Sequence, residues 1–143
     1  MKAALLIQSM TGNTWKAGER IAGLLADEGW TITGLNRVGE PDYSAVQRAD
    51  FVVVGTWVHG LFVVGQAPWG LGAIAHLPVM RGKQAAVFCT YALNSGKSVN
   101  KLNDTVLRLG ADSLGGVALH RAKLEQHCEE FVGRILDNAA VRV

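Results

Sequence analysis

Short apolar runs alternate along this chain with segments of helical periodicity, and this alternation limits the possible folds more than any other feature. The strand-like runs lie at residues 3–8, 30–35, 51–55, 85–89 and 114–119. The segments with helical spacing lie at residues 14–28, 43–48, 67–76, 98–109 and 123–137. Strands that alternate with helices are joined by right-handed crossovers and therefore pair in parallel. The sequence predicts an α/β fold, an open five-stranded parallel sheet with helices on both faces.

The composition of each run indicates its place in the sheet. The runs at 3–8, 51–55 and 85–89 are apolar almost throughout, as expected of parallel strands covered on both faces. The run at 30–35 alternates more and contains threonine, which is typical of an edge strand. Ligands of such sheets bind beyond the carboxyl ends of the strands. The loops to consider are therefore 9–14, 56–65 and 90–97.

Composition excludes several classes of protein. The 143 residues suit a single domain, 1–143, and a net charge of +2 without a Lys/Arg run argues against nucleic-acid binding. No apolar run reaches the ~20 residues of a membrane helix, so no membrane insertion is expected. Met1 and Lys2 lead directly into a strand, without a signal-peptide pattern, which favours a cytoplasmic protein. Cys89 and Cys128 lack metal or redox spacing and are predicted to be reduced, buried thiols.

The first loop, Ser9-Met10-Thr11-Gly12-Asn13-Thr14, has the features of an anion site. It joins an apolar strand to a helix start, where unpaired backbone N–H groups and the helix dipole favour a phosphate. Ser9, Thr11 and Thr14 add hydroxyl donors, and Gly12 allows a close approach of the backbone. The alternative is an ordinary strand–helix joint in which a threonine or asparagine serves only as the N-cap.

Other phosphate motifs do not match the chain. No GxGxxG follows the first strand. Ser95-Gly96-Lys97-Ser98 imitates the end of a Walker A motif, but Tyr91 stands where its first glycine is required. The first loop is therefore the phosphate-site hypothesis that the residues favour.

The first loop resembles the (S/T)-x-T-G-x-T phosphate loop of the flavodoxins, small FMN-binding flavoproteins that carry electrons, and the chain length and element order resemble their short-chain members. The resemblance implies a flavodoxin-like three-layer α/β/α sandwich with strand order 2-1-3-4-5, and FMN held non-covalently at the carboxyl ends of the strands. It implies that Ser9, Met10, Thr11, Gly12, Asn13 and Thr14 hold the FMN phosphate.

The other two loops match the flavodoxin pattern loosely. The resemblance implies contacts with the flavin ring from Thr56, Trp57, Val58, His59 and Gly60, and from Thr90, Tyr91, Ala92 and Asn94. His59 stands where the family usually has its stacking aromatic, and Trp57 lies two residues earlier; we expect Trp57 to cover the ring, with His59 close by. The alternatives are a solvated histidine, a tryptophan that caps the core, and a tyrosine that anchors its hydroxyl at the surface.

The resemblance implies an electron carrier that meets redox partner proteins, as a monomer or weak dimer, with no catalytic residues of its own. An FMN-dependent NAD(P)H:quinone or flavin reductase is the alternative, and an interaction module that has lost its flavin is a third possibility. Many flavodoxins carry carboxylates around the flavin, but residues 56–65 and 90–97 of this chain contain no Asp or Glu. We therefore expect a less negative second reduction potential than in an acidic flavodoxin.

Overall fold

The structure is a computed structural model that describes residues 1–143 except 10–11, 60–66, 69–70, 93–95 and 140–143, and except the side chains at 59, 67, 68 and 71. The elements follow in the order β1 (Lys2–Ile7), α1 (Asn13–Asp27), β2 (Thr31–Arg37), α2 (Tyr43–Arg48), β3 (Phe51–His59), β4 (Ala67–Pro68), α3 (Leu71–Ala75), β5 (Gln84–Tyr91), α4 (Ser98–Arg108), β6 (Asp112–His120), the 3₁₀ turn η1 (Arg121–Lys123) and α5 (Leu124–Asn138). The predicted alternation of strands and helices is confirmed.

The parallel strands run in the order β2-β1-β3-β5-β6, and the short strand β4 adds antiparallel to the end of β3. Counting the parallel strands alone, this is the predicted order 2-1-3-4-5, with β2 at an edge as expected. The order reverses at β1, so the crevice where ligands of such sheets bind lies beyond the carboxyl ends of β1 and β3.

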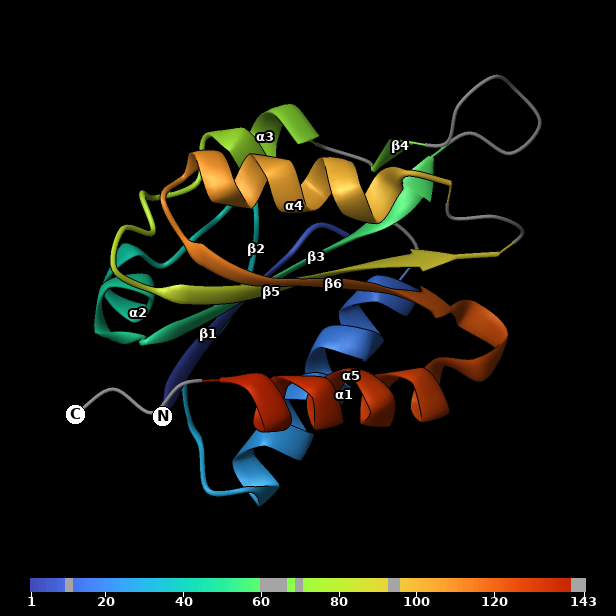
Figure 1. The fold of residues 1–143 in the computed structure, drawn as a ribbon, viewed down its shortest axis with the longest axis horizontal. Coiled ribbons are helices and arrows are strands. Elements are labelled where there is room, and N and C mark those ends of the chain that lie inside the picture. The colour runs from blue at the N-terminus through green and yellow to red at the C-terminus, as the bar shows by residue number, and fades with distance from the viewer. Residues whose placement is uncertain (10–11, 60–66, 69–70, 93–95, 140–143) are drawn as a thin grey trace.

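Two apolar clusters hold the three layers together. One joins α1 and α5 to one face of the sheet, and the other joins α2, α3 and α4 to the opposite face (Figure 1). Successive residues of a strand point to opposite faces, so Val53 belongs to the first cluster and Val52 to the second. This two-sided burial explains why the central strands are apolar throughout.

The central strands are longer than the sequence indicates. The sequence predicts loops that begin at Thr56 and Thr90, but β3 continues to His59 and β5 to Tyr91. The ladder between them pairs Thr56 with Cys89 and Trp57 with Thr90, and both threonines are buried in it. The strands continue through Thr56 and Thr90 because the ladder between β3 and β5 includes both threonines.

A second expectation, a helix over 67–76, is wrong for Ala67 and Pro68. Ala67 and Pro68 form β4, which pairs with His59 and Val58 of β3, and the helix α3 covers only Leu71–Ala75. Proline suits a short edge strand because it has no N–H to contribute to a ladder. This pairing is a tertiary contact that local periodicity cannot indicate.

Candidate functional site

The candidate site lies at the carboxyl end of the sheet, where β1, β3 and β5 deliver the three loops. Of the predicted contacts, Met10, Thr11, Gly60 and Asn94 lie outside the described residues, as does the side chain of His59. The remaining residues can be placed: Ser9, Gly12, Asn13, Thr14, Thr56, Trp57, Val58, Thr90, Tyr91 and Ala92.

The start of α1 is built around Gly12 and Ser9. Gly12 is the N-cap residue, with φ +93°, and a Cβ at this position would project into open space. The Ser9 hydroxyl accepts the backbone N–H groups of Gly12 and Trp15, each at 3.3 Å. Within the described part of the chain, α1 has no side-chain N-cap bond and no acidic residue in its first turn. The expectation of a threonine or asparagine as the N-cap residue is therefore wrong, because Gly12 occupies that position.

The positive end of α1 thus meets a neutral hydroxyl, which accepts two backbone N–H groups, and a glycine beside which a Cβ would meet no described atom within 4 Å. A helix start with a nearby hydroxyl and a glycine in the left-handed region suits a phosphate group without requiring a cation. The donor set fits the phosphate of a mononucleotide.

Thr14 and Thr90 connect the first loop to the third. Their hydroxyl oxygens lie 2.8 Å apart and form a hydrogen bond, and the two residues are 1% and 4% exposed. The sequence suggested that Thr14 donates directly to a phosphate and that Thr90 contacts a flavin ring. In the structure their mutual bond fixes the end of β5 against the first turn of α1.

The second segment reaches the site as the end of a strand. Thr56 is fully buried, whereas Trp57 and Val58 are partly exposed. Trp57 therefore lies partly exposed at the carboxyl end of β3, and its ring is of the aromatic kind on which planar ligands stack. Its role toward such a ligand stays a prediction.

Tyr91 has a neighbour that the sequence did not indicate. Its partly exposed ring meets the ring of His120 edge-to-face, with centroids 4.9 Å apart and an interplanar angle of 85°. Two hydrogen bonds hold His120 in place. Its ring atom Nδ1 accepts the backbone N–H of Ala122 at 3.1 Å, and its backbone N–H donates to Nδ1 of His127 at 2.8 Å. Only the strand register, which pairs Tyr91 with His120, brings these residues together.

A cation–π contact flanks the first loop on the other side. The guanidinium carbon of Arg37, at the end of β2, lies 4.7 Å from the centroid of the Trp15 ring. This contact fixes the tryptophan that follows the phosphate-loop sequence. No motif in the sequence links the two residues, since they meet only through the pairing of β1 with β2.

The two cysteines are free and buried, as predicted. Burial raises the pKa of the Cys89 thiol to about 12 and that of Cys128 to about 11. Both stay protonated near neutral pH, so neither supplies a thiolate nucleophile. Among the residues that the structure describes, no group of three or more His, Cys, Asp or Glu side chains could hold a metal ion.

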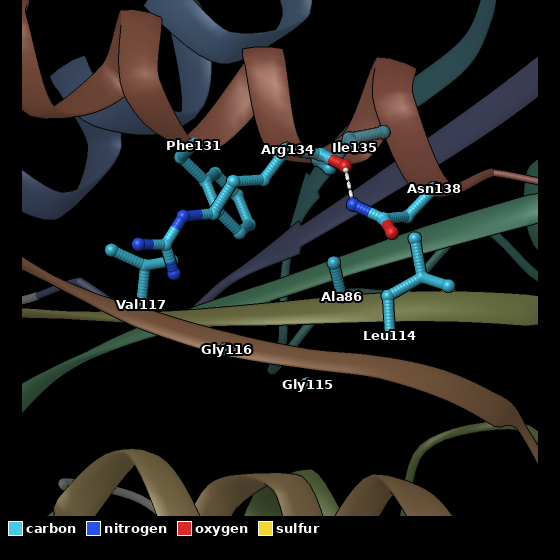
Figure 2. Close-up of a pocket in the computed structure, with 9 residues that line it drawn as sticks. All are labelled: Ala86, Leu114, Gly115, Gly116, Val117, Phe131, Arg134, Ile135 and Asn138. Atoms are coloured by element: carbon cyan, nitrogen blue, oxygen red, sulfur yellow. Dashed lines mark hydrogen bonds between the residues drawn. The ribbon is translucent and has the colours of Figure 1, made fainter.

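A separate cavity of about 210 Å³ lies between β6 and α5 and is not part of the candidate site. Figure 2 shows Ala86 pointing from β5 toward α5, with Phe131 and Ile135 above it and the Arg134 side chain over Val117. Gly115 offers no side chain to fill this space, and a Cβ there would meet nothing within 4 Å. The cavity therefore lies where the edge strand β6 leaves a gap beside α5.

Two kinds of comparison give no match: no protein-family model matches the chain, and neither does any curated protein. None of the helices that the structure describes is long and apolar enough to cross a membrane.

Comparison with solved structures identifies the class of fold, a flavodoxin-like α/β/α sandwich. The chain is similar to flavodoxin 1 from Bacillus cereus, with a TM-score of 0.72, 22% identity and coverage of 98% of this chain and 100% of that one. It is similar to a cysteine-to-serine mutant of the flavodoxin from Pseudomonas aeruginosa, at TM-score 0.72, 18% identity and coverage of 96% and 97%. The Megasphaera elsdenii flavodoxin gives TM-score 0.69, 17% identity and coverage of 92% and 98%. The fold that the sequence predicted is confirmed over nearly the whole chain.

Proposed function

We propose that this chain binds FMN non-covalently and carries electrons between partner proteins. The observation that carries the proposal is the start of α1, where Gly12 at positive φ and the hydroxyl of Ser9 stand beside the first turn of the helix, the place where we propose the phosphate binds. The fold supports it, because the solved structures similar to this chain over nearly their whole length include flavodoxins. When bound, FMN supplies a centre that accepts and releases one or two electrons.

The proposal assigns residues of the chain to two sets of contacts, one with the phosphate and one with the flavin ring. The phosphate contacts are Ser9, Met10, Thr11, Gly12, Asn13 and Thr14. The ring contacts are Thr56, Trp57, Val58, His59 and Gly60 from the end of β3, and Thr90, Tyr91, Ala92 and Asn94 from the end of β5. Trp57 and Tyr91 would contact the ring and exclude water from it, and Thr14 and Thr90 hold the first and third loops together through their hydrogen bond.

The first test is titration of the FMN-free chain with FMN and with riboflavin, followed by quenching of flavin fluorescence. Each hydrogen bond to a charged group contributes about 1.5–3 kcal/mol, so two phosphate bonds give FMN an advantage of at least about 10²-fold over riboflavin. Equal affinity for the two flavins would contradict the phosphate site. If neither flavin binds, only the fold assignment stands, and the alternative of an interaction module without a flavin is favoured.

A matched pair of glycine variants separates binding from backbone strain. Gly12→Ala and Gly29→Ala each place a Cβ in open space at positive φ, at opposite ends of α1. Both variants lose similar stability, about 1–2 kcal/mol, because the strain is the same. Only Gly12→Ala is expected to weaken FMN, and equal affinities would count against the proposed phosphate site.

Stepwise reduction of the FMN-loaded chain distinguishes the carrier from an enzyme. A carrier shows two separate one-electron couples and negligible NAD(P)H consumption. Rapid oxidation of NAD(P)H with a quinone or a free flavin as acceptor would favour the reductase instead.

A further inference from the structure

Three exposed cations stand at the carboxyl end of the sheet, beside the candidate site. Lys97 precedes α4, and Arg121 and Lys123 belong to the turn η1 between β6 and α5. Tyr91 of β5 pairs with His120 of β6, so the segments that follow these two strands emerge at the same end of the sheet (Figure 1). We call Lys97, Arg121 and Lys123 the basic rim.

The positive charge of the basic rim is not engaged in ion pairs within the described part of the chain. The ion pairs found there are those of Arg20 with Glu125 and Glu129, at 2.6 and 3.8 Å, and none involves the rim. Glu125, the acidic residue of the first turn of α5, is thus already engaged by Arg20. The sequence from 56 to 65 and from 90 to 97 contributes no carboxylate.

Helix geometry strengthens the same field. Lys97 is the N-cap residue of α4 and Lys123 is the N-cap residue of α5, and neither makes a side-chain cap bond. A lysine is unfavourable there, because its charge adds to the positive end of the helix dipole. Two helix starts and three cations therefore direct a positive potential outward from the edge of the candidate site.

We propose that the basic rim is the docking surface for a redox partner protein whose contact surface is acidic. The inference rests on the proposed function, since the rim matters for electron transfer only if FMN is bound beside it. Complementary charge steers encounter and sets orientation more than it sets affinity. In each productive encounter one electron leaves the reduced FMN and enters the oxidised partner, and no covalent bond forms or breaks.

The experiment uses the FMN-loaded full chain, reduced with dithionite and mixed with oxidants of opposite charge in a stopped-flow instrument. The protein probes are cytochrome b5, which is acidic, and cytochrome c, which is basic; hexacyanoferrate(III) serves as a small anion. The rate with cytochrome b5 is expected to fall as salt is raised, and the rate with cytochrome c to rise, because salt screens attraction and repulsion alike.

Two triple variants carry the same loss of charge at opposite ends of the sheet. The rim variant is Lys97→Gln, Arg121→Gln and Lys123→Gln. The control is Arg48→Gln, Arg81→Gln and Arg108→Gln, three exposed arginines that precede β3, β5 and β6. At low salt the rim variant is expected to slow reaction with cytochrome b5 roughly tenfold, within the range of electrostatic steering, and the control to change it little.

Each outcome has one meaning, because the flavin spectrum of every variant is recorded first. If no variant or parent binds FMN, the proposed function fails and this inference fails with it. If FMN binds and both triple variants slow cytochrome b5 equally, net charge and not the rim is responsible, and the docking surface is refuted. Salt dependence confined to hexacyanoferrate would also refute it, in favour of a small anionic acceptor.

Discussion

The hydrogen bond between Thr14 and Thr90 gives a sharp quantitative prediction, because it is buried and joins two loops of the candidate site. Thr14→Val and Thr90→Val each remove one hydroxyl and leave the other buried without its partner. A buried polar group left unsatisfied costs about 1–3 kcal/mol, whereas replacing both partners by apolar groups of the same shape is nearly neutral. The double variant should therefore be more stable than either single variant.

The assay is urea unfolding of the four proteins in a double-mutant cycle, with stability taken from the midpoint and slope of each curve. The expected coupling free energy between the two threonines is about 1–3 kcal/mol. Thr105→Val is the control: Thr105 is also buried, but its hydroxyl donates to the carbonyl of Lys101 in its own helix. The carbonyl of Lys101 keeps its place in the backbone hydrogen bonding of α4 when this hydroxyl is removed, so the expected change in unfolding free energy is small.

Two results would refute this reasoning. If the single costs simply add in the double variant, the hydroxyl groups do not depend on each other. If the single variants are as stable as the parent, the hydrogen bond between the two threonines contributes nothing to stability.

Three further predictions follow from packing and burial. Gly55→Ala places a Cβ 2.1 Å from Cζ of Phe88 and is expected to cost about 3 kcal/mol or more in unfolding free energy, and Phe88→Leu in the same chain should recover part of this loss. Ala86→Val adds two methyl groups to the cavity beside α5 and is expected to raise the free energy of unfolding by about 1 kcal/mol. Ala85→Val is the control: it lies on the opposite, filled face of β5 and should lower that free energy by about 1–3 kcal/mol. Equal effects of the two variants in urea unfolding would contradict the presence of unfilled space beside Ala86. The pKa of Cys89, raised to about 12, lies above the value of about 8.5 for an unfolded thiol. The thiol's contribution to stability is therefore complete below about pH 8 and is lost as pH rises toward 12. The slope of the unfolding free energy against pH in this range should be shallower in Cys89→Ala.

The sequence predicted the architecture well because that architecture follows from local signals. The run from Tyr43 to Arg48 forms the helix expected, and the strand order follows from the alternation of elements together with the family resemblance. The lengths of β3 and β5 were underestimated. Gly55 looks like the end of a strand, yet β3 continues through it. The glycine is needed there because the ring of Phe88 occupies the place of a side chain.

The candidate site was predictable only in part, for a physical reason. Residues that are close in sequence, such as Ser9 and Gly12, could be assigned to one loop from their spacing. Contacts that depend on strand register could not: Tyr91 meets His120 only because β5 pairs with β6. The basic rim could not be predicted for the same reason, since Lys97 and Lys123 lie beside one site only in the folded chain.

The position of these lysines distinguishes a docking role from a folding role. The chain builds a favourable N-cap at α2, where the Asp42 carboxylate accepts the N–H of Ala45 at 3.1 Å, so the fold does not force lysine into that position at α4 and α5. Removing a cation from a helix start contributes about 0.3–1 kcal/mol at a surface site. Lys97→Gln and Lys123→Gln should therefore stabilise the protein in urea while slowing reaction with an acidic oxidant. Opposite signs for stability and rate cannot arise from damage to the fold, and a variant that loses both would show that the lysines serve the fold instead.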